Sequence, residues 1–299
     1  MTVKLGLNIP NFGSAASPET LYGWVRFGED TGFSIAMMSD HVAPTPDVAA
    51  IYPTPFYDTF TTLAWLAGRA TSIELGTTVA VLPYRNPLLT ARVAANIDQF
   101  SGGRFVLGVG VGWSKPEHDA LGVSFADRGR ITDEYLDVIR DHWAHDVISR
   151  TGDHVEFHEV HTLPAPVRSR HIPIWVGGNS AAAIRRTAVR GEAWHPINMN
   201  LDWLRDTGLP ALRAEAERAG RPVPVLAPRI RARPTPEALP EEGRLSGVGS
   251  VDQIVADIHT LVELGSEYVV LDTNPDEPGI QNPKEDWEVL ETLARRVLG

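Results

Sequence analysis

The stretch that decides the fold is Ile-Pro-Ile-Trp-Val-Gly-Gly-Asn-Ser-Ala-Ala-Ala-Ile-Arg-Arg-Thr-Ala, residues 172–188. Its first five residues are mostly apolar and predict a buried strand, and its Ala-rich second half predicts a helix. Gly177 and Gly178 mark the turn between the two. A buried strand that passes through a short turn into a helix is the repeating unit of a parallel sheet with crossover helices.

The same alternation recurs in both directions from this stretch. Capping residues mark the expected helix starts within this alternation. Ser17, Asn86 and Asn282 each stand before a proline, and Ser250 with Gln253 forms a capping-box pattern. Eight such units predict an α/β fold, a single (β/α)₈ TIM barrel domain covering the whole chain, with a doubly wound sheet as the alternative. The predicted strands are residues 3–10, 33–40, 73–82, 105–111, 172–176, 193–197, 224–231 and 268–272.

Three longer segments interrupt the pattern as insertions, at residues 42–57, 146–171 and 233–249. Loops that follow the strands of such a barrel surround its active site. We therefore expect the first and third insertions to shape a substrate pocket. Pro196 and Pro228 interrupt the sixth and seventh predicted strands, because proline removes a hydrogen-bond donor from a sheet.

Composition limits the classes of function. The 299 residues carry 27 basic and 38 acidic side chains, a net charge of −11, which argues against a nucleic-acid or anionic-membrane partner. The absence of cysteine excludes disulfides, thiol nucleophiles and cysteine-ligated metals. No signal peptide or apolar run of membrane-spanning length is recognisable. We expect a cytoplasmic protein that binds a small molecule.

Three polar residues close the second predicted strand, at the end where barrels carry their active sites. Asp40 and His41 follow Ser39 there, and an acid beside an imidazole can exchange protons with a bound ligand. The structural alternative is that Asp40 caps a turn and His41 bonds a loop carbonyl.

The fourth predicted strand carries glycines with a period of two. Gly108, Gly110 and Gly112 fall on one face of it. Because such glycines pack nothing, we expect a flat cofactor ring to approach this backbone. Clearance for a bulky neighbouring side chain is the alternative. The spacing does not fit the dinucleotide-binding fingerprint or a P-loop.

The turn of residues 177–180 predicts an anion site. Gly177 and Gly178 allow close approach, Asn179 and Ser180 offer donors, and the positive end of a helix follows. An ordinary strand-to-helix turn is the alternative. A residue pair that can carry a proton, a strand face without side chains and a turn suited to phosphate together favour a phosphorylated organic cofactor.

One cluster has the composition of a metal site. It contains His154, Glu156, His158, Glu159 and His161. The apolar residues that alternate with them favour a solvated hairpin in an insertion, and we expect no metal site.

Five motifs extend over most of the chain and carry a family resemblance. They are residues 39–42 (SDHV), 75–87 (LGTTVAVLPYRNP), 101–113 (SGGRFVLGVGVGW), 173–180 (PIWVGGNS) and 191–196 (GEAWHP). With them the chain resembles the bacterial luciferase-like superfamily, and within it the coenzyme F420-dependent oxidoreductases. The resemblance implies a homodimeric barrel enzyme that transfers a hydride between F420 and a small organic substrate.

The resemblance also assigns residues. It implies that Asp40 is the acid near the cofactor ring, that His41 handles the proton, and that a non-prolyl cis peptide at Thr78–Val79 supports the ring. The turn of residues 177–180 matches the family's phosphate-binding turn. Trp113 stands where the sugar-phosphate dehydrogenases of the group carry a glutamate, which implies a more apolar pocket.

Other functions remain open at this stage. FMN in place of F420 makes the chain a two-component monooxygenase, and a flavin-binding protein without catalysis or a metal-dependent barrel lyase or hydrolase are further alternatives. If F420 binds, its anionic tail needs positive charge, and Arg85, Lys115 and Arg186 are the candidates to supply it.

Overall fold

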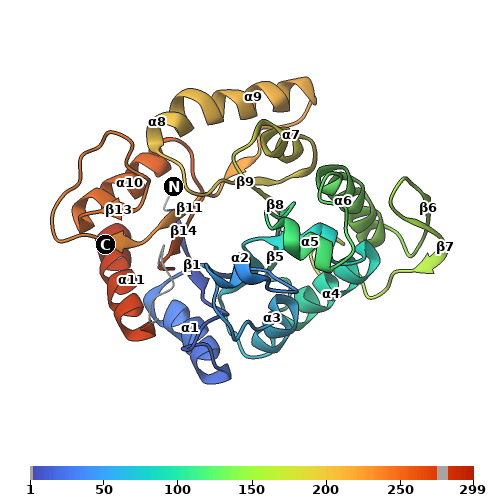
Figure 1. Cartoon of the computed structure of the whole chain (residues 1–299), viewed down its shortest axis with the longest axis horizontal. Coiled ribbons are helices and arrows are strands. Elements are labelled where there is room, and N and C mark those ends of the chain that lie inside the picture. The colour runs from blue at the N-terminus through green and yellow to red at the C-terminus, as the bar shows by residue number, and fades with distance from the viewer. Residues whose placement is uncertain (1–2, 275–281) are drawn as a thin grey trace.

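Parallel strands form the centre of the fold, and helices pack around their outer side (Figure 1). The computed structural model describes residues 3–274 and 282–299. Its main sheet is curled and runs in the order β10-β9-β8-β5-β3-β2-β1-β14-β11, with β4 paired to β5. The strands of this sheet are β1 (Lys4–Ile9), β2 (Ile35–Met38), β3 (Glu74–Thr77), β4 (Ala80–Val81), β5 (Phe105–Gly110), β8 (Ile174–Gly177), β9 (Ala193–His195), β10 (Val225–Leu226), β11 (Arg229–Arg231) and β14 (Tyr268–Asp272).

The predicted strand 224–231 is present in two pieces. β10 pairs with β9 and β11 pairs with β14, and Pro228 lies between the pieces. Backbone hydrogen bonds continue across the break, because Ala227 donates to Trp194 O and Val270 donates to Pro228 O. Proline therefore interrupts the ladder, as the sequence predicted, without removing the strand from the sheet.

The predicted strand 73–82 is present as two shorter strands, β3 and β4, with a break at residues 78–79. β3 ends at Thr77, and the following Thr78–Val79 peptide bond is cis, as the family resemblance implied. The chain then forms the short strand β4 on β5 and a 3₁₀ turn at Leu82–Tyr84. Thr78 and Val79, which lie between β3 and β4 at the carboxyl end of the sheet, are called the bulge.

Helix boundaries follow the capping residues. Ser17, Asn86 and Asn282 cap α1, α4 and α11, and Ser250 with Gln253 forms the predicted capping box of α10. The helices are α1 (Pro18–Thr31), α2 (Pro46–Ala49), α3 (Thr59–Ala67), α4 (Pro87–Phe100), α5 (Lys115–Ala120), α6 (Arg128–Ala144), α7 (Ala181–Arg190), α8 (Leu201–Trp203), α9 (Leu209–Arg218), α10 (Val251–Glu263) and α11 (Pro283–Leu298), with a π-helical turn at Leu204–Gly208.

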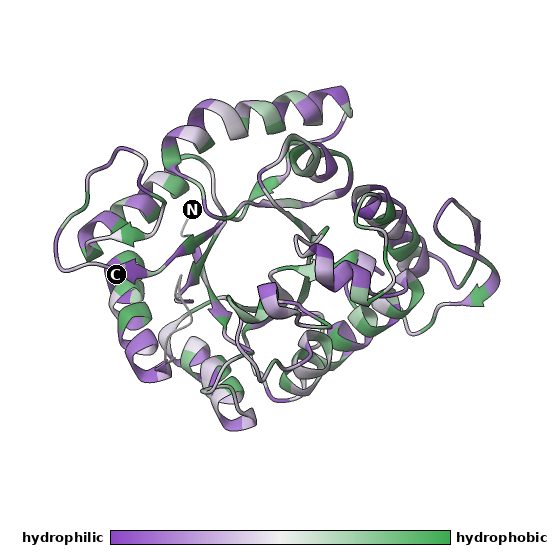
Figure 2. Ribbon diagram, in the orientation of Figure 1, coloured by the Kyte–Doolittle hydropathy of each residue, from purple (hydrophilic) through white to green (hydrophobic). Residues whose placement is uncertain are grey.

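The apolar core has two parts on opposite sides of the sheet. Alternate residues of β1, Leu5, Leu7 and Ile9, join the larger part, which lies between the strands and the helices. Ile35 and Met37 of β2 belong to the smaller part inside the curled sheet. The helices show hydrophobic and hydrophilic stretches side by side in Figure 2, as expected for helices with one buried face.

The insertions differ in what they form. Residues 42–57 contain α2, and residues 146–171 contain the predicted hairpin as β6 (Val147–Thr151) and β7 (Glu156–His161), which projects from the edge of the molecule (Figure 1). The third insertion is bordered by β12 (Arg233–Pro234) and β13 (Val248–Gly249). None of the helices within the described ranges is both long and apolar enough to span a membrane.

Candidate active site

A cavity of about 330 Å³ opens at the carboxyl ends of the strands. Its volume is in the range of small-molecule and cofactor sites. The residues that line it are Ser39, Asp40, His41, Tyr52, Thr78, Val79, Val81, Gly110, Val111, Gly112, Trp113, Gly177, Gly178, Ile197 and Arg229. The cavity thus brings together predicted site residues from four separate motifs.

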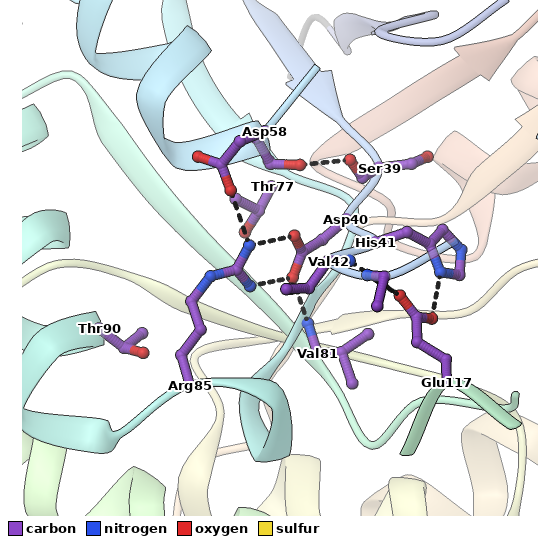
Figure 3. Close-up of polar contacts among 12 residues, drawn as sticks. Ser39, Asp40, His41, Val42, Asp58, Thr77, Val81, Arg85, Thr90 and Glu117 are labelled. Atoms are coloured by element: carbon purple, nitrogen blue, oxygen red, sulfur yellow. Dashed lines mark hydrogen bonds and ion pairs between the residues drawn. The ribbon is translucent and has the colours of Figure 1, made fainter. Parts of the chain in front are cut away.

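His41 is held by a carboxylate. Its Nδ1 lies 2.6 Å from Glu117 Oε2, and both side chains are buried (Figure 3). The other carboxylate oxygen accepts hydrogen bonds from the backbone amides of Val42 and Ala43, at 2.8 and 3.0 Å. Burial alone would raise the pKa of Glu117, but the bonds from His41 and these amides outweigh it and hold the pKa below its usual value. Glu117 is therefore ionised beside the imidazole.

Sequence reasoning missed Glu117. The signal that the sequence offered was Ser114-Lys-Pro-Glu117, a capping-box pattern at the start of α5, and Ser114 Oγ does accept a bond from Glu117 N. In a capping box the glutamate returns to its own helix, whereas here its carboxylate reaches His41, 76 residues away in the chain. That contact depends on the tertiary fold and has no local signature.

Asp40 has a different environment from the one predicted. Arg85 binds its two carboxylate oxygens at 2.7 and 2.8 Å, and Val81 N donates to Oδ2 at 3.0 Å (Figure 3). The side chain is buried, and Arg85 is in turn bound to Asp58. These donors hold the carboxylate in one orientation. Asp40 lines the cavity with its carboxylate bound by Arg85 and Val81, and its role beside a cofactor ring stays a prediction.

The glycine face of β5 clears space for side chains of the neighbouring bulge. A Cβ on Gly110 would lie 2.6 Å from Val79 Cγ2, and a Cβ on Gly108 would lie 1.9 Å from Thr77 O. A Cβ on Gly177 of β8 would approach Val79 Cγ1 to 2.9 Å. Clearance for a neighbouring side chain is therefore confirmed at Gly110, whereas at Gly108 the close neighbour is a backbone oxygen. Val79 itself lines the cavity, so the surface offered to a ligand is this side chain together with the glycine backbone.

A buried polar network of Arg229, His195 and Asp272 holds Thr78 of the bulge in place. Arg229 Nη1 donates to Thr78 O at 2.8 Å, and its Nε and Nη2 donate to Asp272 Oδ2. His195 Nε2 lies 2.8 Å from Thr78 Oγ1. Burial lowers the pKa of His195 to about 4, and the charge of Arg229 acts in the same direction, although the carbonyl of Ala227 opposes it. His195 is neutral at pH 7, and Arg229 and Asp272 carry opposite charges.

Sequence reasoning also missed this network. An arginine in the middle of a predicted strand and an aspartate at the end of another were available signals, because each is costly to bury alone. Their pairing across 43 residues was visible only in the fold.

The predicted phosphate turn is only partly directed at the cavity. Gly177 and Gly178 line it, but Asn179 and Ser180 are not among the described lining residues. Asn179 makes two hydrogen bonds to the backbone of Ile197, and Ser180 caps α7 by accepting from Ala183 N. The Asn179 amide is thus engaged with Ile197, whereas the Ser180 hydroxyl accepts a bond here, and phosphate binding by these two side chains stays a prediction. The backbone amides at the start of α7 lie close to Gly178 in the chain, and helix N-termini of this kind are able to bind anions.

The predicted cations for an anionic tail have other partners. Arg85 binds Asp40 and Asp58, Arg186 is buried against Asp133, and Lys115 pairs with Asp119 on the surface. Neither Arg85 nor Arg186 is a free cation. Residues 233–249 contribute no described residue to the cavity lining, so the expectation for the third insertion is wrong, whereas Tyr52 of the first insertion lines the cavity.

The fold and site geometry agree with the family comparison. The chain belongs to the luciferase-like monooxygenase family, whose model matches residues 4–242. A protein of Mycobacterium tuberculosis described as uncharacterised is 32% identical over 186 residues, 56% of this chain and 62% of that protein. The FMNH₂-dependent dimethylsulfone monooxygenase of Pseudomonas putida is 35% identical over 135 residues, 44% of this chain and 37% of that enzyme. The matches thus span less than two thirds of these relatives.

Solved structures share the whole fold at low sequence identity. The F420-dependent tetrahydromethanopterin reductase of Methanopyrus kandleri has a TM-score of 0.79 and 17% identity over 100% of this chain and 99% of that one. The oxygenating constituent of 3,6-diketocamphane monooxygenase of Pseudomonas putida, in complex with FMN, has a TM-score of 0.78 and 16% identity over 99% and 98%. Relatives of this fold are therefore oxidoreductases and monooxygenases that use F420 or FMN.

Proposed function

We propose that the protein is an oxidoreductase that transfers a hydride between coenzyme F420 and a small organic substrate. The observation that carries the proposal is the His41–Glu117 pair, 2.6 Å apart, on the wall of a cavity at the carboxyl ends of the strands. A proton carrier of this kind is what hydride transfer to a polar double bond needs, because the receiving molecule must also take up a proton.

The residues present fit a tricyclic ring with a phosphate. The cavity has a face built from the Val79 side chain and from the backbone of Gly110, Gly177 and Gly178, which a flat molecule can approach closely. The ten-residue helix α7 begins three residues beyond Gly178, and the backbone amides of Ala181 and Ala182 in its first turn have no helical partner. These amides would hold the phosphate, and the Val79 side would support the ring.

The protein residues have separate tasks in this proposal. Glu117 binds Nδ1 of His41, which orients the imidazole, and it leaves Nε2 as the nitrogen that can exchange a proton with substrate. Asp40 and Arg85 fix the backbone at Val81, and Arg229 fixes the carbonyl of Thr78. F420, when bound, supplies or accepts the hydride.

FMN is the second candidate. The dimethylsulfone monooxygenase among the sequence relatives is FMNH₂-dependent, and the same cavity would then serve a reaction of reduced flavin with oxygen. We favour F420 because the five motifs of residues 39–42, 75–87, 101–113, 173–180 and 191–196 resemble the F420-dependent group. A flavin-binding protein without catalysis would bind the cofactor and turn over no acceptor.

Titration of the purified protein with F420 and with FMN, followed by cofactor fluorescence, tests the proposal. We expect micromolar or tighter binding of F420 and weaker binding of FMN. His41→Gln should keep cofactor affinity and lower turnover by about 10²–10⁴-fold, as for loss of a general acid or base. Submicromolar FMN affinity without F420 binding would overturn the cofactor assignment. Unchanged turnover of the variant would remove the role of His41.

We further propose that the curled sheet is a closed eight-stranded barrel in a single domain. Counting β10 and β11 as one strand gives eight positions around the sheet, and the hydrogen bonds at Ala227 and Val270 join the two ends. A homodimer is proposed from the family resemblance, and the mass in solution from light scattering tests it. A monomer at micromolar concentration would contradict it.

A further inference from the structure

A half-exposed aromatic side chain, Trp113, lies at the wall of the cavity. Trp113 is 47% exposed, and its ring centroid lies 5.9 Å from that of His41 at an interplanar angle of 79°. It follows Gly112, the last glycine of the β5 stretch, and precedes α5. A half-exposed tryptophan beside the proton-carrying residue leaves apolar area that a ligand can cover.

The backbone on both sides of Trp113 is anchored. Gly112 has φ of +79°, and its α-carbon is packed so closely against His118 and Val81 that a Cβ would lie 2.6 and 2.7 Å from them. Ser114 caps α5 and donates to Asp47 Oδ2 at 2.7 Å. The indole is therefore presented from a rigid segment, which lowers the entropy that a ligand must overcome to bind it.

Among the described residues, Asp40 and Arg229 of the cavity wall are each bound to a group of opposite charge, and His41 is bound to a carboxylate. Asp40 is bound by Arg85, Arg229 by Asp272, and His41 by Glu117. An anionic or cationic substrate would bury a charge against groups whose own charges are already neutralised, and such burial is costly. The rest of the lining is mostly apolar or aromatic, with Val81, Val111, Trp113 and Ile197, and the hydroxyl of Ser39 is an uncharged polar group among them.

We propose that Trp113 is the substrate-binding surface of the cavity, and that the substrate is a neutral, flat carbonyl compound that packs against the indole with its reacting group near His41. This inference rests on the proposed function, because it assigns the substrate class of that site. An aromatic aldehyde or a cyclic enone has the required chemistry: an electron-poor carbon accepts the hydride and the carbonyl oxygen or the adjacent carbon accepts the proton.

Calorimetric titration of the cofactor-loaded protein with two matched probes tests the inference. Benzaldehyde is neutral and 4-carboxybenzaldehyde differs from it by one negative charge. We expect benzaldehyde to bind at least about tenfold more tightly. Trp113→Ala should weaken benzaldehyde binding about tenfold, and Trp113→Phe should restore most of it. Trp65→Ala removes a similarly exposed tryptophan on α3 outside the cavity and should leave affinity unchanged.

Cofactor affinity is measured separately for each variant by fluorescence. If no cofactor binds to the wild-type protein, the proposed function fails before the substrate is tested. If cofactor binds normally but benzaldehyde does not bind, or binds no better than the charged probe, the substrate class is wrong. Equal affinity of the wild-type and Trp113→Ala proteins for benzaldehyde overturns the role of Trp113.

Discussion

His142 should make the protein lose stability in acid. The side chain lies on α6, which packs against α4; it is 1% exposed, and neither ring nitrogen has a hydrogen-bond partner among the described residues. Burial lowers its pKa to about 4 from 6.5, and the charge of Arg92 on α4 contributes. Between these two values the unfolded chain binds a proton that the folded chain does not, so the free energy of unfolding falls as pH falls.

The size of the effect follows from the shift. Between pH 7.5 and 4.5 the free energy of unfolding should fall by about 2–3 kcal/mol on account of His142 alone. His142→Leu removes the titrating group and two unpaired nitrogen atoms, so the variant should lose less stability over this range. Urea unfolding of both proteins at pH 7.5, 6.5, 5.5 and 4.5, followed by circular dichroism, measures the difference.

The control is His158→Leu on the exposed hairpin β6–β7, where the imidazole is 72% exposed and its loss should not alter the pH dependence. Buried His195 contributes its own acid-dependent loss, which is common to all three proteins. If the stability difference between wild type and His142→Leu is constant from pH 7.5 to 4.5, the argument from burial is refuted.

Three further variants test the site. Glu117→Gln should lower turnover about 10–100-fold and leave cofactor affinity unchanged, because the amide holds the His41 imidazole less firmly than the carboxylate does; unchanged turnover would contradict this positioning role. Arg229→Met removes the counter-ion that binds buried Asp272 at 2.6 Å and leaves it only Arg231, at 4.0 Å, so it should destabilise the protein by about 3–5 kcal/mol in urea unfolding; a loss below about 1 kcal/mol contradicts this. Gly110→Ala should cost about 1–3 kcal/mol through its clash with Val79, and Val79→Ala in the same chain should recover most of it; no recovery would place the clash elsewhere.

Elements with a strong local pattern were predictable from the sequence. β14 has its predicted bounds, and β1, β2 and β5 lie within theirs, because a buried parallel strand is a short apolar run between turn residues. The capping residues Ser17, Asn86, Asn282 and Ser250 act at the helix starts where they were expected. In each of these cases the residues of the element itself were enough to predict where it lies.

Contacts between distant segments were not predictable. The glycines of β5 were interpreted as clearance for a cofactor, because a strand pattern cannot show that Val79 of another segment occupies that space. Asp40 was interpreted as a proton carrier, since its partner Arg85 lies 45 residues away. Asn179 was assigned to phosphate, although its amide is used by Ile197. In each case the residue type was recognised and its partner was not.

The Glu117 carboxylate bonds the imidazole and the first two amides of the 42–57 insertion at once. Anyone grafting that insertion from a related barrel to change substrate range must therefore graft the 113–117 segment with it. A transplanted loop without Glu117 would leave two amides and an imidazole without their acceptor. A chimera that carries only one of the two segments would therefore lose both the anchoring of the loop and the orientation of His41. The two segments are one module for protein engineering.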